Sequence, residues 1–386
     1  MSWSNTKLLT LIAAVLIAAT LAVFWQRRPQ PISSDIPATK LPAVSAGRAV
    51  TAPAIPSEQR TAFAAIHSTI DGLSATNSTV SGRDSVARLR GELEELPRDA
   101  ASAAIREFLA ANIDAPTRAD FRVGPDGFLT QPTTLRVFLL DYLGRIDPAA
   151  AAKYAEIILS EKSSADEWAV AMRNYAMGNP TSEGREYLRR KFIEMAGYEP
   201  WQSAPSIGFL EAFDVAVAMG GGDVTVKLAG MIRQKDNPAV AHAAFLACDR
   251  LVLAAPAETL SLFQAQPELM AGREATRANY FARADVQDAQ QRQVLAQYLL
   301  DPRHTTAELE TFAGLFPSAN FMLSNNLLTR NPTPDGAVLE KQDSAALKTV
   351  NEWLADPKFA RLRPQLQKIT ERLQNFARQR ENTAPP

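Results

Sequence analysis

From residue 57 onward, apolar residues recur at spacings of three and four positions, and this period constrains the fold more than any other feature of the chain. In the first segment, Phe63, Ile66 and Ile70 fall on one face of a helix that opens at Ser57. Proline, Asp or Asn stands at the start of many later segments, where the fixed φ of proline and its missing N–H are tolerated. The pattern predicts an all-α body made of amphipathic helices.

The later helices should be joined by short links, so that neighbouring helices form antiparallel hairpins stacked side by side. This arrangement is α-solenoid-like. The ranges expected to be helical are 83–96, a segment through 105–113, 132–146, 148–162, 165–177, 183–196, 205–219, 223–234, 238–254, 256–264, 274–284, 286–300, 306–315, 344–355 and 359–380.

One small β-hairpin is expected at residues 121–130, where two short apolar runs flank the turn Gly124-Pro125-Asp126-Gly127. Because no strand pattern of comparable length occurs elsewhere in the chain, we interpret this hairpin as an insertion in a helical protein.

Residues 8–25 carry no charge, and as a helix they would span roughly 27 Å, close to the thickness of the hydrocarbon core of a bilayer. Trp3 and Trp25 stand near its two ends, where indole rings favour the headgroup region. The segment predicts a membrane anchor. A cleaved signal peptide is the alternative, but its cleavage site near residues 20–22 would be a poor one.

The positive charges on the two sides of the anchor are nearly equal, because Lys7 and the amino terminus precede it and Arg27 and Arg28 follow it. A short N-terminal tail before a large body favours export of the body, which predicts a single-pass inner-membrane protein with a periplasmic body. A cytosolic body stays open as the alternative.

Domain organisation follows from these patterns in four parts. Residues 1–28 form the anchor, and residues 29–57 form a linker with six prolines and few large apolar side chains, which favours an extended spacer. Residues 58–131 form an N-terminal helical region, and residues 132–386 form a helical-repeat domain with a capping helix at its C-terminal end.

Composition limits the chemistry. The formal net charge of −1 gives no general attraction to nucleic acid, so no nucleic-acid partner is expected. Cys248 is the one cysteine, which excludes an intrachain disulfide and a cysteine-based zinc site. The three histidines, His67, His242 and His304, are far apart in sequence. We therefore predict no metal and no cofactor.

Two patterns resemble catalytic or binding motifs. Residues 220–222 are three glycines followed by Asp223, Thr225 and Lys227, but the Gly-Lys-Ser/Thr order of a phosphate loop is absent. We expect these glycines to end one helix, with Asp223 as the cap of the next. His242 and Cys248 could pair, but six residues on a helix turn through about 600°, which separates the two side chains.

Charged residues also gather in two clusters on predicted helices. The acidic cluster is Glu92, Glu94 and Glu95, and the basic cluster is Arg185, Arg189, Arg190 and Lys191. Charge on an amphipathic helix usually covers its solvated face, and docking of a partner is the alternative.

An apolar seam follows the C-terminal helix at alternating spacings of three and four, within residues 359–376. Its members are Phe359, Leu362, Leu366, Ile369, Leu373 and Phe376. The other face is basic. The seam predicts a cap that closes the last hairpin, with self-association of two copies through residues 359–376 as the alternative.

Residues 236–251 begin Asp-Asn-Pro-Ala-Val-Ala-His-Ala-Ala and continue to Ala247, Arg250 and Leu251. This segment resembles the P-x-V-x-x-A-A-x-x-A pattern of HEAT-type helical repeats, with His242 where such repeats often have arginine. The resemblance covers about one helix. It implies an α-solenoid and a protein-binding surface, and it implies no catalysis.

These observations predict a membrane-anchored helical-repeat scaffold that binds other proteins, in a bacterial cell envelope, and that is not an enzyme. No residue is assigned a catalytic, cofactor-binding or metal-binding role. The alternative function is an envelope hydrolase whose site is dispersed over the helices.

Overall fold

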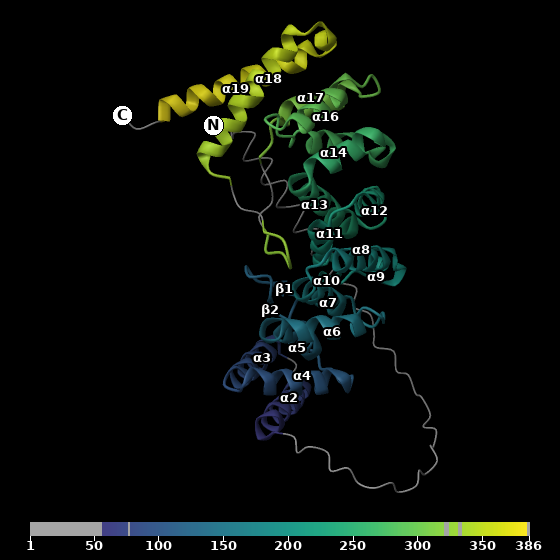
Figure 1. Ribbon diagram of the computed structural model, residues 1–386, viewed down its shortest axis with the longest axis vertical. Helices are drawn as coiled ribbons and strands as arrows, with labels where there is room; N and C mark the ends of the chain where they lie inside the picture. The colour runs from purple at the N-terminus through teal and green to yellow at the C-terminus, as the bar shows by residue number, and fades with distance from the viewer. Residues whose placement is uncertain (1–55, 76–77, 320–323, 331–333, 384–386) are drawn as a thin grey trace. The chain divides into compact units, whose positions relative to one another are not determined.

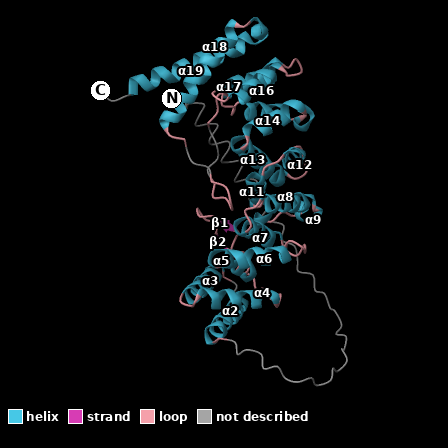
Figure 2. Cartoon of the chain, viewed as in Figure 1, coloured by secondary structure: helices cyan, strands magenta, loops and turns pink. Residues whose placement is uncertain are grey.

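Helices make up most of the computed structural model, which describes residues 56–75, 78–319, 324–330 and 334–383 (Figures 1 and 2). The predicted all-α class is confirmed for these residues. The predicted anchor, residues 8–25, and nearly all of the predicted linker, residues 29–57, lie outside them. Contacts divide the chain into two units at residue 54, and every element described below belongs to the second unit, Ile55–Pro386.

The first half of the described chain contains helices and one pair of strands. In chain order they are α2 (Ser57–Ala75), α3 (Thr79–Glu94), α4 (Arg98–Ala110), β1 (Arg122–Val123), β2 (Leu129–Gln131), α5 (Leu135–Ile146), α6 (Pro148–Ile158), α7 (Ala165–Gly178), α8 (Ser182–Gly197), α9 (Glu199–Ser203), α10 (Ile207–Glu211), α11 (Phe213–Met219) and α12 (Gly222–Ile232).

The remaining elements are also helical. They are α13 (Pro238–Ala254), α14 (Pro256–Ala265), a 3-10 helix (Pro267–Met270), α15 (Glu274–Phe281), α16 (Ala289–Leu300), α17 (Thr306–Leu315), α18 (Gly336–Ala355), a second 3-10 helix (Pro357–Leu362) and α19 (Arg363–Thr383).

Short polar side chains begin many of these helices. The Asn237 side chain accepts a hydrogen bond from Val240 N, and proline follows it at the first helical position of α13. The same side-chain cap occurs at Thr134, Asp147, Ser164, Thr181, Ser206, Asp288, Thr305 and Asp335. The starts of the helices therefore follow from local sequence.

Two layers run through the middle of the unit. We call α5, α7, α10, α11, α13, α15 and α17 the A layer, and α6, α8, α12, α14 and α16 the B layer. Within the A layer, α5 packs on α7, α7 on α10, α11 on α13, and α15 on α17. Within the B layer, α8 packs on α12, α12 on α14, and α14 on α16. Apolar side chains between the layers form one continuous core.

The predicted β-hairpin is confirmed. Strands β1 and β2 form an antiparallel pair, and Gly127 has a φ of +84° in the turn between them, which glycine adopts without strain. Leu129 N donates to the buried Asp141 carboxylate of α5 at 2.9 Å. The hairpin is thus attached to the A layer.

Residues 205–219, predicted as one helix, form two helices instead. The chain turns more tightly at Ala212, where Val215 N donates to Ala212 O at 3.0 Å, a 3-10 bond. The short helix α9 was not predicted. The expected cap at Asp223 is also wrong, because Gly221 precedes the first helical residue and Asp223 lies in the first turn of α12.

The C-terminal segment, predicted as one helix, begins as a 3-10 helix and becomes α19 at Arg363. Pro364 then stands in the first turn of α19, where its missing N–H is not needed. α19 packs on α17 and α18, and the seam residues Leu366 and Ile369 are buried there, whereas Phe376 is 41% exposed.

Basic residues of α19 and of the 3-10 helix before it bind other parts of the same chain. Lys368 Nζ lies 2.9 Å from Glu310 Oε2, and Arg361 donates to the carbonyls of Leu299 and Asp301. Much of the basic face is therefore occupied inside the chain.

Replacement of Ile369 by alanine should lower the free energy of unfolding by about 2–4 kcal/mol, because a fully buried side chain leaves a cavity. Phe376→Ala on the same helix serves as control and should change it by less than about 0.5 kcal/mol. Urea unfolding measures both. Equal effects would mean that the seam does not pack on α17 and α18.

Candidate functional site

A segment between α17 and α18 lies against distant parts of the chain, and we call its residues 324–330 the strap. Figure 1 shows it beside α11 and the β1–β2 hairpin. Asn325 Nδ2 donates to Val123 O, which is 202 residues away in sequence. Leu327 is buried with 2% of its surface exposed. The strap is thus a segment that bends at Leu327 and Leu328 and is held on the A-layer side of α11.

Asp214 of α11 makes the central contact with the strap. Its Oδ2 accepts the backbone N–H groups of Leu328 at 2.6 Å and Thr329 at 2.9 Å. Its Oδ1 accepts the Thr329 hydroxyl and, at 3.1 Å, Arg250 Nη1 of α13. Asp214 has no exposed surface. A fully buried carboxylate is stable only when such donors surround it.

The turn of the β-hairpin forms the next part of this site. A Cβ atom at Gly127 would lie 2.5 Å from Leu327 O and 2.7 Å from Arg330 Nη2, so the strap passes directly over a glycine. Arg173 of α7 donates to Gly127 O at 3.0 Å and to Asp141 Oδ1 at 2.5 Å, and both hydrogen bonds are buried. These contacts fix the turn that the strap covers.

Two further charged groups border Asp214. Arg250 uses Nη1 for Asp214, but its Nε is buried and has no hydrogen-bond partner among the residues that the structure describes. Glu211, the last residue of α10 and three residues before Asp214, is partly buried. Burial, against an opposing effect of Arg250 and with a smaller contribution from Asp214, raises the pKa of Glu211 to about 7.

Buried or nearly buried arginine–carboxylate pairs connect successive A-layer helices, with Arg283 just beyond the end of α15. The partners are separated by 31 to 36 residues in sequence and by 2.5 to 3.1 Å in space. The pairs are Arg136–Glu167, Asp141–Arg173, Asp214–Arg250, Asp249–Arg283 and Arg277–Glu308. The Asp214 site is therefore one member of a series, and it differs from the other members because the strap also binds it.

His304 belongs to the last of these pairs and is buried in the loop just before α17. Its Nδ1 lies 3.2 Å from Arg277 Nη2 and 3.3 Å from Glu308 Oε2. Tyr298 donates its hydroxyl to Glu308 at 3.0 Å. Despite burial, hydrogen bonds from Arg277 and His304 lower the pKa of Glu308 to about 2. The group is a closed ionic network without an open face.

The three glycines at 220–222 form a turn that an arginine fills. Gly220 and Gly221 have φ values of +63° and +103°, and they link α11 to α12. Arg189 of α8 donates to Gly220 O at 3.1 Å and lies 3.7 Å from Asp223. The basic cluster and the glycine turn therefore meet, and Arg189 occupies the space that a phosphate would need.

The histidine–cysteine pair is not a nucleophilic site. Cys248 is fully buried, and burial raises the pKa of its thiol far above the usual range, which keeps it protonated. His242 is exposed on α13 and stacks on Phe245. His67 lies between the rings of Phe63 and Phe108.

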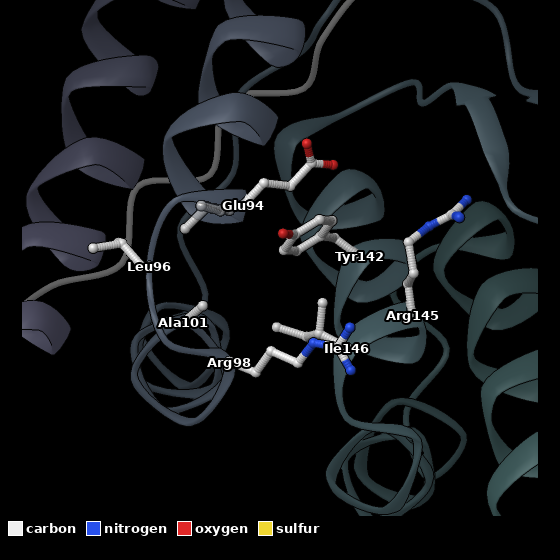
Figure 3. A pocket seen from close by; sticks show the side chains of 8 residues that line it. Glu94, Leu96, Arg98, Ala101, Tyr142, Arg145 and Ile146 are labelled. Atoms are coloured by element: carbon white, nitrogen blue, oxygen red, sulfur yellow. The ribbon is translucent and has the colours of Figure 1, made fainter.

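Glu94 of the acidic cluster lines a cavity of about 200 Å³ between α3, α4 and α5 (Figure 3). Tyr142, Arg98 and Arg145 also line it. Burial raises the pKa of the Tyr142 hydroxyl, and Glu94 adds to this shift. Arg145 is already paired with Asp126 at 2.8 Å and lies over the Phe128 ring, so it contributes little free charge to the cavity.

Over the described ranges, no three His, Cys, Asp or Glu side chains come close enough together to hold a metal ion. In the same ranges, no single helix is both long enough and apolar enough to cross a membrane. The consecutive helices α13 and α14 together meet these two criteria, but a bend of 118° separates them.

Sequence reasoning missed the Asp214 site, because Asp214 and Thr329 are 115 residues apart. The one local signal was a charged residue within the apolar run of residues 213–217. Comparison of the chain with protein-family models, with curated proteins and with solved structures found no match.

The raised pKa of Glu211 predicts that stability falls as pH rises. Between about pH 4.5 and 7 the unfolded chain releases this proton whereas the folded chain keeps it, so the free energy of unfolding decreases across that window, by up to about 3 kcal/mol. Glu211→Gln should flatten this slope in urea unfolding measured at pH 5 and pH 8.

The control for this measurement is Glu258→Gln on the exposed face of α14, which should keep the slope of the unaltered chain. An unchanged slope in Glu211→Gln would contradict the assignment.

Proposed function

We propose that this protein is a membrane-anchored scaffold of the α-solenoid type, with HEAT-like repeats, that binds peptide segments of other proteins and is not an enzyme. Residues 8–25 anchor it in the inner membrane of a bacterial envelope, residues 29–57 serve as the spacer, and the body lies in the periplasm. The anchor and spacer parts of the proposal rest on the sequence alone.

The repeat part of the proposal is supported by the two layers and by the regular separation of the buried pairs, 31 to 36 residues. In the HEAT-like segment, Asn237 caps α13 and Pro238 opens it, while Ala244 and Ala247 are fully buried between helices. Small buried residues let helices pack closely, as stacked hairpins require.

One observation carries the binding part of the proposal: the Asp214 carboxylate accepts two consecutive backbone N–H groups from the bend of the strap. A group that binds main-chain atoms recognises a peptide chiefly through its backbone. Stacked helical hairpins present long surfaces of this kind to partners.

Membrane topology is tested by fusing a reporter that is active only outside the cytosol after Pro386, with fractionation of the same cells. We expect an active reporter in the membrane pellet. An inactive, membrane-bound reporter would contradict the periplasmic location, and an active reporter in the soluble fraction would contradict the anchor.

The binding face is tested with a photo-crosslinking amino acid at Leu253 or at Val226. Both side chains are 40% exposed. Leu253 lies one turn after Arg250 on α13, whereas Val226 lies on α12 of the B layer. In living cells, the yield of crosslinked protein adducts should be at least about fivefold higher with the crosslinker at Leu253 than at Val226. Equal yields from both positions would contradict binding through the A layer.

A further inference from the structure

Resting on the proposed function, we propose that the Asp214 site is a peptide-binding site, which the strap fills in the isolated chain and a similarly bent segment of a partner protein takes over. The partner segment supplies two consecutive backbone N–H groups, a Ser or Thr hydroxyl on the second of these residues, and an apolar side chain two positions before it. These are the groups by which Leu327, Leu328 and Thr329 bind.

The length of the connection supports a role for the strap beyond joining two helices. α17 and α18 both pack on α19, yet the chain between Leu315 and Gly336 is much longer than the links of about 2–8 residues that join packed helices. Loops of this length in compact units usually have a function. Here the loop extends to the hairpin and to α11.

The Asp214 carboxylate explains why the site must always hold a segment, either the strap or a ligand that replaces it. Without the strap it would keep Arg250 and lose the two N–H groups and the hydroxyl that now bind it. A buried carboxylate with too few donors is strongly disfavoured. A ligand that brings the same donors therefore competes with the strap for one position.

Arg250 indicates why a partner segment can replace the strap. Its buried Nε has no hydrogen-bond partner among the described residues, so the strap leaves one donor of the site unused. A segment that also places a carbonyl or carboxylate oxygen against this Nε makes a bond that the strap does not make. Such a segment overcomes the advantage that the strap has from being part of the same chain.

Gly127 limits what can lie in the site. Its Cβ position lies 2.5 Å from Leu327 O, so any side chain there excludes a segment that follows the path of the strap. Gly272 has a similar φ, +73°, but nothing lies within 4 Å of its Cβ position. The two glycines thus form a matched pair, because alanine strains the backbone at both and blocks the strap path at one only.

The test uses the full-length chain in detergent micelles and a fluorescein-labelled peptide with the sequence of residues 324–330, Ser-Asn-Asn-Leu-Leu-Thr-Arg. Leu327→Ser with Thr329→Ala weakens the strap of the chain and leaves Asp214 intact. Fluorescence polarisation should show this release variant binding the peptide at least about tenfold more tightly than the unaltered chain does.

Two additions to the release variant check the site. Asp214→Asn and Gly127→Ala should each weaken peptide binding by at least about tenfold, whereas Gly272→Ala should not change it. Circular dichroism reports whether each variant is folded. If Asp214→Asn reduces the folded fraction, Gly127→Ala still tests the site, because it changes no charge.

Three results would overturn the proposal. The first is a release variant that binds no better than the unaltered chain, and the second is binding that neither Asp214→Asn nor Gly127→Ala weakens. The third is a concentration-dependent dimer of the unaltered chain that Asp214→Asn abolishes, because the occupant would then be a second copy. Peptide binding in micelles is measured independently of the cellular location of the protein and of crosslinking at Leu253. A negative peptide-binding result can therefore be distinguished from a failure of the scaffold proposal.

Discussion

A buried carboxylate must be surrounded by donors, and this requirement at Asp214 organises the centre of the structure. Its two oxygens accept from Arg250 of the next A-layer helix and from the strap. These contacts fix the register of α11 against α13 and the path of residues 324–330 at the same time. Because an unpaired buried charge is strongly destabilising, Asp214 needs Arg250 together with the donors that the strap, or a ligand in its place, supplies.

The same rule acts along the whole A layer. Apolar packing between helices tolerates small shifts, whereas an arginine that binds a carboxylate through two nitrogens accepts few geometries. The pairs Arg136–Glu167 and Arg283–Asp249 are of this kind. We infer that the apolar core supplies most of the stability, while the buried pairs determine how successive helices are placed.

Sequence reasoning succeeded where the cause of structure is local. Asn237 and Pro238 mark the start of α13, and Pro148 marks that of α6, because caps and missing N–H groups act within one turn. It failed at Ala212, where packing of α10 on α7 accompanies a break in the helix. The role of Arg189 in the glycine turn was also missed, since its contact with Gly220 crosses 31 residues.

The sequence by itself determined the helical class, the hairpin at residues 121–130 and most helix starts, because period, turn chemistry and capping are short-range effects. Only the tertiary structure decided which charges are buried together, how the basic residues of α19 are used, and that the strap returns to Asp214. These depend on contacts between residues that are 31 to 202 positions apart, and no local pattern specifies them.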